Sequence, residues 1–411
     1  MIAFRIQSRR TQAALACLLS AALLGGCATN TMTGRMQLSL MSEEGIAKQS
    51  VTYYSAMVGD LDRKNKIIES GPERERIVKI TNRLIEQAVL YHPESRGWDW
   101  RVVIIDEPST VNAFCMPGGL MGIYTGFMKQ LNATDDEIAQ IMGHEIGHAL
   151  AGHGAEKMSV QLASNVAVLV ASAALATNSQ EFQNNQTLLT VGALAFVNLP
   201  NSRDAETEAD RIGIELASRA GYDPAAAVTL WEKMKVKAGG SRLDFLSTHP
   251  SPANRADYLS GLQSPMGEFY TEARAKPSEP YDWLHADKSA RPTVDESKAI
   301  ALYSPEWDRF KKGEAELMED NVPAFLLKQN TLKSAYERGG WRDLAHHVMD
   351  LNFRLDLTYY YLGQAAKGLG FDAAASRYLA TAQELSQQNE TACAKRRLVS
   401  CAGLNPSVAS Q

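Results

Sequence analysis

The chain has 411 residues, of which 45% are hydrophobic, and carries a formal charge of −5 at pH 7. This length and composition are sufficient for a full hydrophobic core and predict roughly two domains. Because an acidic chain is a poor binder of phosphate backbones, the composition argues against nucleic acid as a partner.

The N-terminus has the pattern of an export signal. Residues 1–26 combine a basic start with an apolar run from Ala13 to Leu24, and Leu24-Gly25-Gly26-Cys27 has the form of a bacterial lipobox. We therefore predict that residues 1–26 are removed and that Cys27 carries lipid, the alternative being an ordinary signal peptide in which Cys27 is incidental. Ala28 after the cysteine favours the outer membrane, so we expect a lipid-anchored periplasmic protein with residues 27–42 as its tether.

Two helices and two strands are predicted next. Helices are expected at residues 43–58 and 73–91, the second with an apolar stripe of Ile77, Ile80, Leu84 and Ala88. Strands are expected at residues 98–105 and 120–124.

A segment between these strands is predicted to lie at a sheet edge, because Pro117 is unsuited to a central strand. An exposed edge can hold an extended peptide by strand addition, so Asn112, Ala113, Phe114 and Cys115 are the candidate substrate-binding residues. The alternative is a plain edge strand.

Residues 134–153 predict a helix that carries metal ligands. It starts with a capping box of Thr134 and Glu137. His144 and His148 are four residues apart, so both imidazoles project from one helical face and can meet one ion at about 2.0–2.1 Å. Glu145 is rotated by about 100° from His144, where it can reach a water bound to that ion and act as general base. This His-Glu-x-x-His pattern is the signature of zinc peptidases.

Uncharged runs follow at residues 158–180 and 184–199. Such runs can span a membrane, but interspersed Gln, Asn and Ser residues and Pro200 favour a hairpin that covers the cleft or touches the membrane surface.

A second helix, predicted at residues 202–220, supplies the missing ligand. Glu206, Asp210 and Gly213 share a face with small residues that permit close helix approach, so Glu206 is the predicted third zinc ligand. Asp210 is predicted to hydrogen-bond a ligand imidazole and fix its tautomer, the alternative being a simple surface acid. The opposite face is predicted to be solvated, because its charged residues pair at i,i+3 and i,i+4 spacing; they are Glu208, Arg211, Glu215 and Arg219. His153 is predicted to cap a helix end rather than bind metal.

These motifs together resemble those of the gluzincin family that includes CAAX proteases, heat-shock membrane metalloproteases and periplasmic lipoprotein proteases. The match comprises His144-Glu145-x-x-His148, Arg203-x-x-Glu206-x-Glu208-Ala209-Asp210 and Asn112-Ala113-Phe114-x-x-Pro117-Gly118-Gly119. Thr33-Gly34-Arg35-x-Gln37-Leu38-Ser39 resembles the exported branch that contains the beta-barrel assembly-enhancing protease. The resemblance covers residues 30–262. It implies that His249, in a His-Pro loop, is a latch or a transition-state contact.

The C-terminal part is predicted to be a separate helical domain. Residues 275–303 read as a linker, and residues 304–411 as helices that include one tetratricopeptide-like pair. Its role would be to bind a protein partner or to stabilise the chain. Cys393 and Cys401 are predicted to form a disulfide, with two free thiols as the alternative.

The expected fold is therefore α+β, a mainly helical zincin-like metallopeptidase domain (residues 43–274) with a small sheet, followed by an all-helical domain. The expected function is a zinc endopeptidase with one Zn²⁺ that cleaves unfolded or misassembled envelope proteins. Partners would include outer-membrane assembly machinery contacted through the C-terminal helices. The alternative function is a chaperone-like adaptor whose metal site stays latched.

Overall fold

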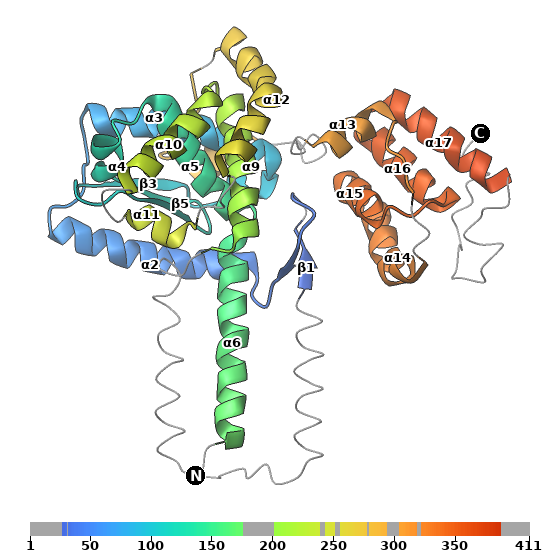
Figure 1. Ribbon diagram of the computed structural model, residues 1–411, viewed down its shortest axis with the longest axis horizontal. Helices are drawn as coiled ribbons and strands as arrows, with labels where there is room; N and C mark the ends of the chain where they lie inside the picture. Colours follow the sequence, from blue (N-terminus) through green and yellow to red (C-terminus); the bar gives the residue numbers. More distant parts are fainter. Residues whose placement is uncertain are drawn as a thin grey trace. The chain divides into compact units, whose positions relative to one another are not determined.

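The computed structural model divides into two compact units, described separately below (Figure 1). The first unit is formed mainly by Met36–Thr293 and the second mainly by Val294–Gln411. The structure describes residues 27–30, 32–175, 201–238, 243–250, 255–277, 279–293, 304–318 and 322–387.

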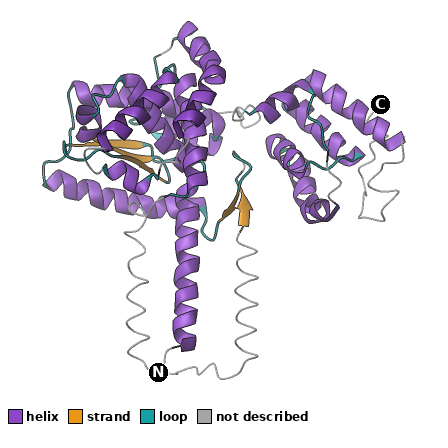
Figure 2. Cartoon of the chain, in the orientation of Figure 1, coloured by secondary structure: helices purple, strands orange, loops and turns teal. Residues whose placement is uncertain are grey.

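A three-stranded sheet lies within the helices of the first unit (Figure 2). Its strands are β3 (Arg101–Ile105), β4 (Ala113–Met116) and β5 (Leu120–Tyr124), in the order β3-β5-β4. β3 pairs with β5 in parallel and β4 pairs with β5 in antiparallel fashion, so β4 is an edge strand as predicted. β3 is shorter than expected, since its pairing with β5 begins only at Arg101; the preceding Trp100 is buried and its indole donates a hydrogen bond to Ser95 O.

The register of β4 decides which backbone groups remain open at the edge. Tyr124 N donates to Asn112 O, and Phe114 stands opposite Gly122. Because paired and unpaired residues alternate in an antiparallel ladder, the main-chain groups of Ala113 and Cys115 face away from β5.

Helix α2 (Glu43–Arg63) covers one face of the sheet. Tyr54 packs there in a core with Val103, Phe114 and Leu120, and its hydroxyl donates to Met121 O at 2.9 Å. The helix extends past the predicted end at residue 58, and an exposed Asp60–Lys64 ion pair of 2.5 Å supports its last turn.

The zinc-motif helix is α5 (Asp135–Leu150), with the predicted capping box at Thr134 and Glu137. Every residue from Glu137 to Leu150 is buried. Helix α3 (Pro72–Tyr91) packs beside it through the predicted apolar stripe, in which Ile77 and Leu84 are fully buried.

Helix α9 (Arg203–Arg219) crosses α5 at a contact made by glycines. A Cβ atom on Gly213 would lie 2.6 Å from the backbone nitrogen of His144, and one on Gly143 would lie 2.8 Å from Gly213 O. The close approach predicted from the small residues of α9 is thus confirmed, and it brings Glu206 to the histidines of α5.

The remaining elements of the first unit complete its helical layer or flank it. They are α4 (Thr125–Gln130), α6 (His153–Leu175), α10 (Ala225–Ala238), α11 (Asp244–Thr248), α12 (Arg255–Ala275), η1 (Pro93–Gly97) and η3 (Lys288–Ala290). No helix in the described ranges has both the length and the apolar character needed to cross a bilayer. The second half of the predicted covering hairpin, residues 176–200, lies outside the described residues.

The predicted tether differs from the structure. Strands β1 (Cys27–Thr29) and β2 (Met36–Leu38) form an antiparallel pair. Gln37 Nε2 donates to Ala151 O at 2.7 Å, and Leu40 N donates to Ser159 Oγ at 3.0 Å. These polar side chains dock the segment onto the peptidase unit, so it is not a free tether.

The predicted linker at residues 275–303 also differs from the structure. Trp283 and Arg291 are buried, and the Arg291 guanidinium donates to the carbonyl oxygens of Arg96 and Trp98. Residues 279–293 therefore belong to the first unit, whereas residues 294–303 lie outside the described ones.

The second unit is helical, as predicted. Helices α16 (Asp356–Gly368) and α17 (Asp372–Gln387) form the predicted pair, and a Cβ atom on Gly363 would meet Leu379 Cδ2 at 2.7 Å. Likeness to tetratricopeptide repeats remains a prediction. Cys393 and Cys401 lie outside the described residues. The helices are α13 (Pro305–Lys312), α14 (Val322–Glu337), α15 (Trp341–Leu351), α16 (Asp356–Gly368) and α17 (Asp372–Gln387).

Candidate metal centre

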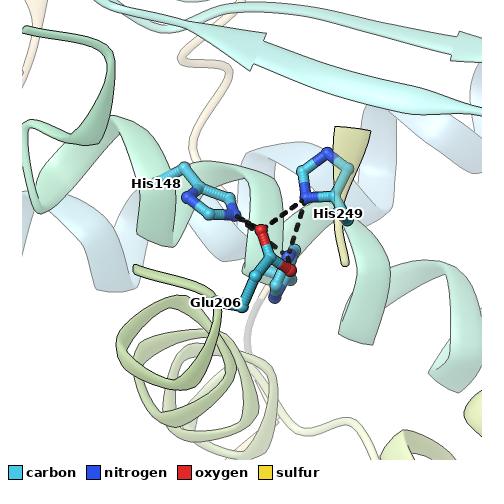
Figure 3. A group of neighbouring side chains, drawn as sticks. His148, Glu206 and His249 are labelled. Carbon is cyan, nitrogen blue, oxygen red and sulfur yellow. Dashed lines mark hydrogen bonds and ion pairs between the residues drawn. The ribbon is translucent and has the colours of Figure 1, made fainter. Parts of the chain in front are cut away.

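Three predicted ligands meet where α5 crosses α9. The Nε2 atoms of His144 and His148 lie 3.1 Å apart, and Glu206 presents its two oxygens to them at 3.4 and 3.3 Å. Candidate ligand atoms from these residues and His249 all lie within 4.8 Å of one another (Figure 3). Two imidazoles and a carboxylate form the donor set that catalytic zinc takes in proteins.

The charges around the cluster suit a cation. Burial opposes protonation of His144, but hydrogen bonds to Asp210 and Glu206 raise its pKa to about 9. Burial lowers the pKa of His148, so this imidazole is neutral and can offer a lone pair. Burial opposes ionisation of Glu206, but hydrogen bonds from the surrounding histidines hold its pKa well below the usual range.

Glu145 lies beside the candidate ligands and lines the same cleft as His148 and His249. Its Oε1 is buried, has no hydrogen-bond partner among the described residues, and stands 3.5 Å from His249 Nε2. Burial raises the pKa of this carboxyl group, which strengthens it as a base. A buried carboxylate oxygen with no partner is costly unless it has a chemical role.

His249 completes the cluster from the C-terminal end of α11. Its ring stacks on Phe245 with centroids 4.2 Å apart, and its Nδ1 lies 3.0 Å from Glu206 Oε1. In Figure 3 the rings of His148 and His249 flank the Glu206 carboxylate. The residue that the family resemblance singled out therefore lies within the ligand group.

Asp210 lies one helical turn beyond Glu206, with Oδ1 2.9 Å from Nδ1 of His144. It is buried, which excludes the alternative of a simple surface acid. The same oxygen accepts from Arg255 at 2.5 Å. Arg255 also donates to Glu206 Oε2 at 3.1 Å, and its guanidinium lies over Trp231, 3.4 Å from the ring centroid.

Sequence reasoning missed Arg255 and Asn201. Asn201 Nδ2 donates to Glu206 Oε1 at 2.8 Å, immediately before the Ser202 cap of α9. Arg255 follows His249 by six residues at the start of α12, and no spacing rule within one helix links it to α9. The signal for Asn201 was its place next to a helix that bears a ligand.

Two predictions about the outer face of α9 are wrong. Glu215 is fully buried, and its carboxylate accepts hydrogen bonds from Tyr91 of α3 and from Arg219, which compensate for the loss of solvent. Glu208 is also mostly buried, with its Oε2 2.7 Å from Nε2 of His153. His153 does not cap α5, because it is the first residue of α6 and its ring faces His148.

The predicted substrate strand borders the metal centre. Asn112, Ala113, Phe114 and Cys115 line a cleft with Glu145, His148, Lys157 and His249. Burial, followed by the charge of Glu145, raises the pKa of the Cys115 thiol, so it stays neutral. The side chain of Phe114 packs in the core with Tyr54, so it fixes the strand.

Part of the chain is similar to a known peptidase family. Residues 72–263 match the model of peptidase family M48, a range that contains every residue of the metal centre. This part of the chain is therefore similar to the M48 peptidases. M48 metalloproteases use zinc, so the match and the four-residue cluster support the predictions of the metallopeptidase class and of one Zn²⁺.

Several metallopeptidases are similar to this chain. Mitochondrial metalloendopeptidase OMA1 of Arabidopsis thaliana is 40% identical over 164 residues, which are 40% of this chain and 32% of that protein. Metalloprotease LoiP of Escherichia coli is 33% identical over 159 residues, 38% of this chain and 60% of LoiP. Metalloprotease YcaL of the same organism is 28% identical over 260 residues, 61% of this chain and 96% of YcaL. The chain thus spans about a third of the Arabidopsis relative.

Proposed function

We propose that the protein is a zinc-dependent endopeptidase that cleaves misfolded or misassembled envelope proteins from a lipid-anchored position in the periplasm. The observation that carries the peptidase assignment is Glu145, whose free buried oxygen borders both the ligand cluster and the cleft beside β4. The compartment is supported by the export signal and lipobox ending at Cys27. The exported lipoprotein branch is supported by the motif at residues 33–39.

The ligand residues fit zinc, which would be held by His144, His148 and Glu206. When bound, it supplies a Lewis acid that polarises the scissile carbonyl and activates water at neutral pH. Glu145 takes a proton from the attacking water and returns it to the leaving amine, because the Oε1 atom of its carboxylate lies beside the cluster with no hydrogen-bond partner among the described residues.

The open edge of β4 aligns the substrate. The main-chain groups of Ala113 and Cys115 face away from β5, and the Cys115 backbone amide donates to the Glu145 carboxylate. An extended polypeptide can therefore add along this edge through the main chain of Ala113. Strand addition recognises main-chain groups rather than particular side chains. A folded protein cannot bind in this way, because its main-chain groups are already hydrogen-bonded within its own structure. The edge strand therefore favours unfolded segments as substrates.

The experiment that tests this function is substrate trapping in the native envelope. Full-length protein with Glu145→Gln should bind zinc and retain uncleaved envelope proteins that the parent protein degrades. Retention of no envelope protein, together with intact zinc binding, would contradict the proposed substrates. Lipid labelling of Cys27, with Cys27→Ala as control, tests the anchor separately.

A second candidate function is a chaperone-like adaptor with a latched metal site. It is favoured by His249, whose Nδ1 lies 3.4 Å from His144 Nε2 and which therefore stands where a fourth ligand would bind. The second unit would then contact outer-membrane assembly machinery. Envelope protection that survives Glu145→Gln would favour the adaptor, whereas its loss would favour the peptidase.

A further inference from the structure

His148 has a second polar neighbour on the side away from the ligand cluster. Its Nδ1 lies 2.7 Å from Nδ1 of His153, and Nε2 of His153 lies 2.7 Å from Oε2 of Glu208. The His153 side chain is 2% exposed and that of Glu208 is 12% exposed. Three side chains from α5, α6 and α9 thus form one continuous row of short polar contacts.

The carboxylate at one end of this row favours one tautomer of His153. The carboxylate of Glu208 only accepts, so Nε2 of His153 carries the proton between them. In the tautomer of His153 with its one proton at Nε2, the lone pair at Nδ1 can accept from an Nδ1–H group of His148. In that arrangement the unprotonated nitrogen of His148 is Nε2, the atom that faces Glu206 at 3.3 Å.

The imidazole of His144, the other predicted ligand on α5, contacts a carboxylate without an intervening residue. His144 meets the Asp210 carboxylate directly through its Nδ1, at 2.9 Å. His148 reaches a carboxylate only through a second imidazole. In both ligand residues Nδ1 faces a hydrogen-bond acceptor, and Nε2 faces the cluster. A proton held at Nδ1 leaves Nε2 as the atom that can bind the metal.

His153 itself is unsuited to bind the metal. Both of its ring nitrogens have partners at 2.7 Å, and the one nearest the cluster points at the outer nitrogen of His148. Gly152, with φ of +66°, separates it from α5 and turns its ring back toward that helix.

We propose that His153 and Glu208 are positioning residues that hold the His148 imidazole in the tautomer and orientation needed to bind zinc. The inference rests on the metal site of the proposed function but not on peptide cleavage. The competing explanation is a buried contact that only fastens α6 to α9, which would affect folding and leave metal affinity unchanged.

The test measures zinc binding directly, by competition with a chromophoric chelator, in full-length protein carrying Glu145→Gln to prevent self-cleavage. His153→Leu and Glu208→Gln should each weaken zinc binding by about 10- to 100-fold. His153→Gln should lose less, because an amide can both accept from His148 and donate to Glu208. Combining His153→Leu with Glu208→Gln should weaken binding no further than the worse single change. Asp204→Asn, an exposed acid one turn earlier on α9, is the matched charge control and should leave affinity unchanged.

Thermal unfolding of the metal-free variants separates the two explanations. Zinc affinities within about twofold of the parent, with or without lower unfolding temperatures, would overturn the proposal, as would additive losses in the double variant. Glu208→Gln is nearly isosteric, so it remains informative if His153→Leu does not fold. A parent protein that binds zinc but cleaves nothing would contradict the peptidase function and leave this inference standing.

Discussion

Oδ1 of Asp210 lies 2.9 Å from Nδ1 of His144 and 2.5 Å from the Arg255 guanidinium. One oxygen thus meets a predicted zinc ligand and a buried cation that also holds Glu206. Because Glu206 and Asp210 are one turn apart on α9, Arg255 keeps two like charges together and fixes both against α5.

We expect Arg255→Met to destabilise the metal-free protein by about 3–5 kcal/mol, because two buried carboxylates would lose their countercharge. The loss should shrink when zinc is added, since the ion supplies positive charge at Glu206. Chemical denaturation with and without zinc measures both values. Arg203→Met, at the exposed start of α9, is the control, and an equal loss in both variants would contradict this role.

Glu145→Gln should lower kcat/KM for an unfolded substrate by about 10²–10⁴-fold while zinc stays bound, because a general base is lost without a ligand. Peptide cleavage assays paired with metal analysis check this. Loss of zinc from the variant would show that Glu145 is itself a ligand.

Glu206→Gln should reduce zinc affinity more than Glu208→Gln, because Glu206 faces both Nε2 atoms whereas Glu208 acts through His153. Chelator competition on the two isosteric variants gives the order. The reverse order would exclude Glu206 as the third ligand.

Gly213→Ala should destabilise the protein by about 1–3 kcal/mol, because the new methyl group would overlap the backbone of His144. It should also weaken zinc binding by moving Glu206 away from α5. Gly261→Ala on α12, where a Cβ would meet nothing within 4 Å, is the matched control and should be neutral or stabilising by up to about 1 kcal/mol. Equal effects at both glycines would contradict the helix-crossing explanation.

The acid dependence of stability should include a contribution from Glu137. Burial opposes its ionisation, but hydrogen bonds from Lys233, Thr134 and Thr229 lower its pKa. The folded-state pKa is therefore below the unfolded value, so the stabilisation is present above about pH 4.3 and disappears as pH falls through the folded-state pKa. Glu137→Gln should cost about 1.5–3 kcal/mol at pH 7. Unfolding at pH 7 and pH 3 measures this difference, and an equal cost at both would argue against it.

The parts of the site that lie within one helix could be predicted from sequence, because a period of 3.6 residues fixes which side chains share a face. His144, Glu145 and His148 on α5, and Glu206 and Asp210 on α9, are of this kind. The edge position of β4 could be predicted because Pro117 limits pairing.

Contacts between helices could not be predicted in the same way. Glu215 lies among charged residues whose i,i+4 spacing is typical of a solvent-exposed face. It is nevertheless buried against Tyr91, which lies 124 residues earlier in the chain. Arg255 and His153 also depend on where α12 and α6 begin relative to α9. The spacing of charges along one helix predicts which side chains are neighbours on that helix. It does not predict which other helix will bury them.

The N-terminal hairpin has a mechanical consequence. Asn30 and Gln37 both donate to the carbonyl oxygen of Ala151, which lies between His148 and His153 in the chain. Tension applied to the start of the hairpin is therefore delivered to the junction of α5 and α6. A force on the N-terminal hairpin would therefore act on the chain three residues after His148, whose imidazole is a predicted zinc ligand.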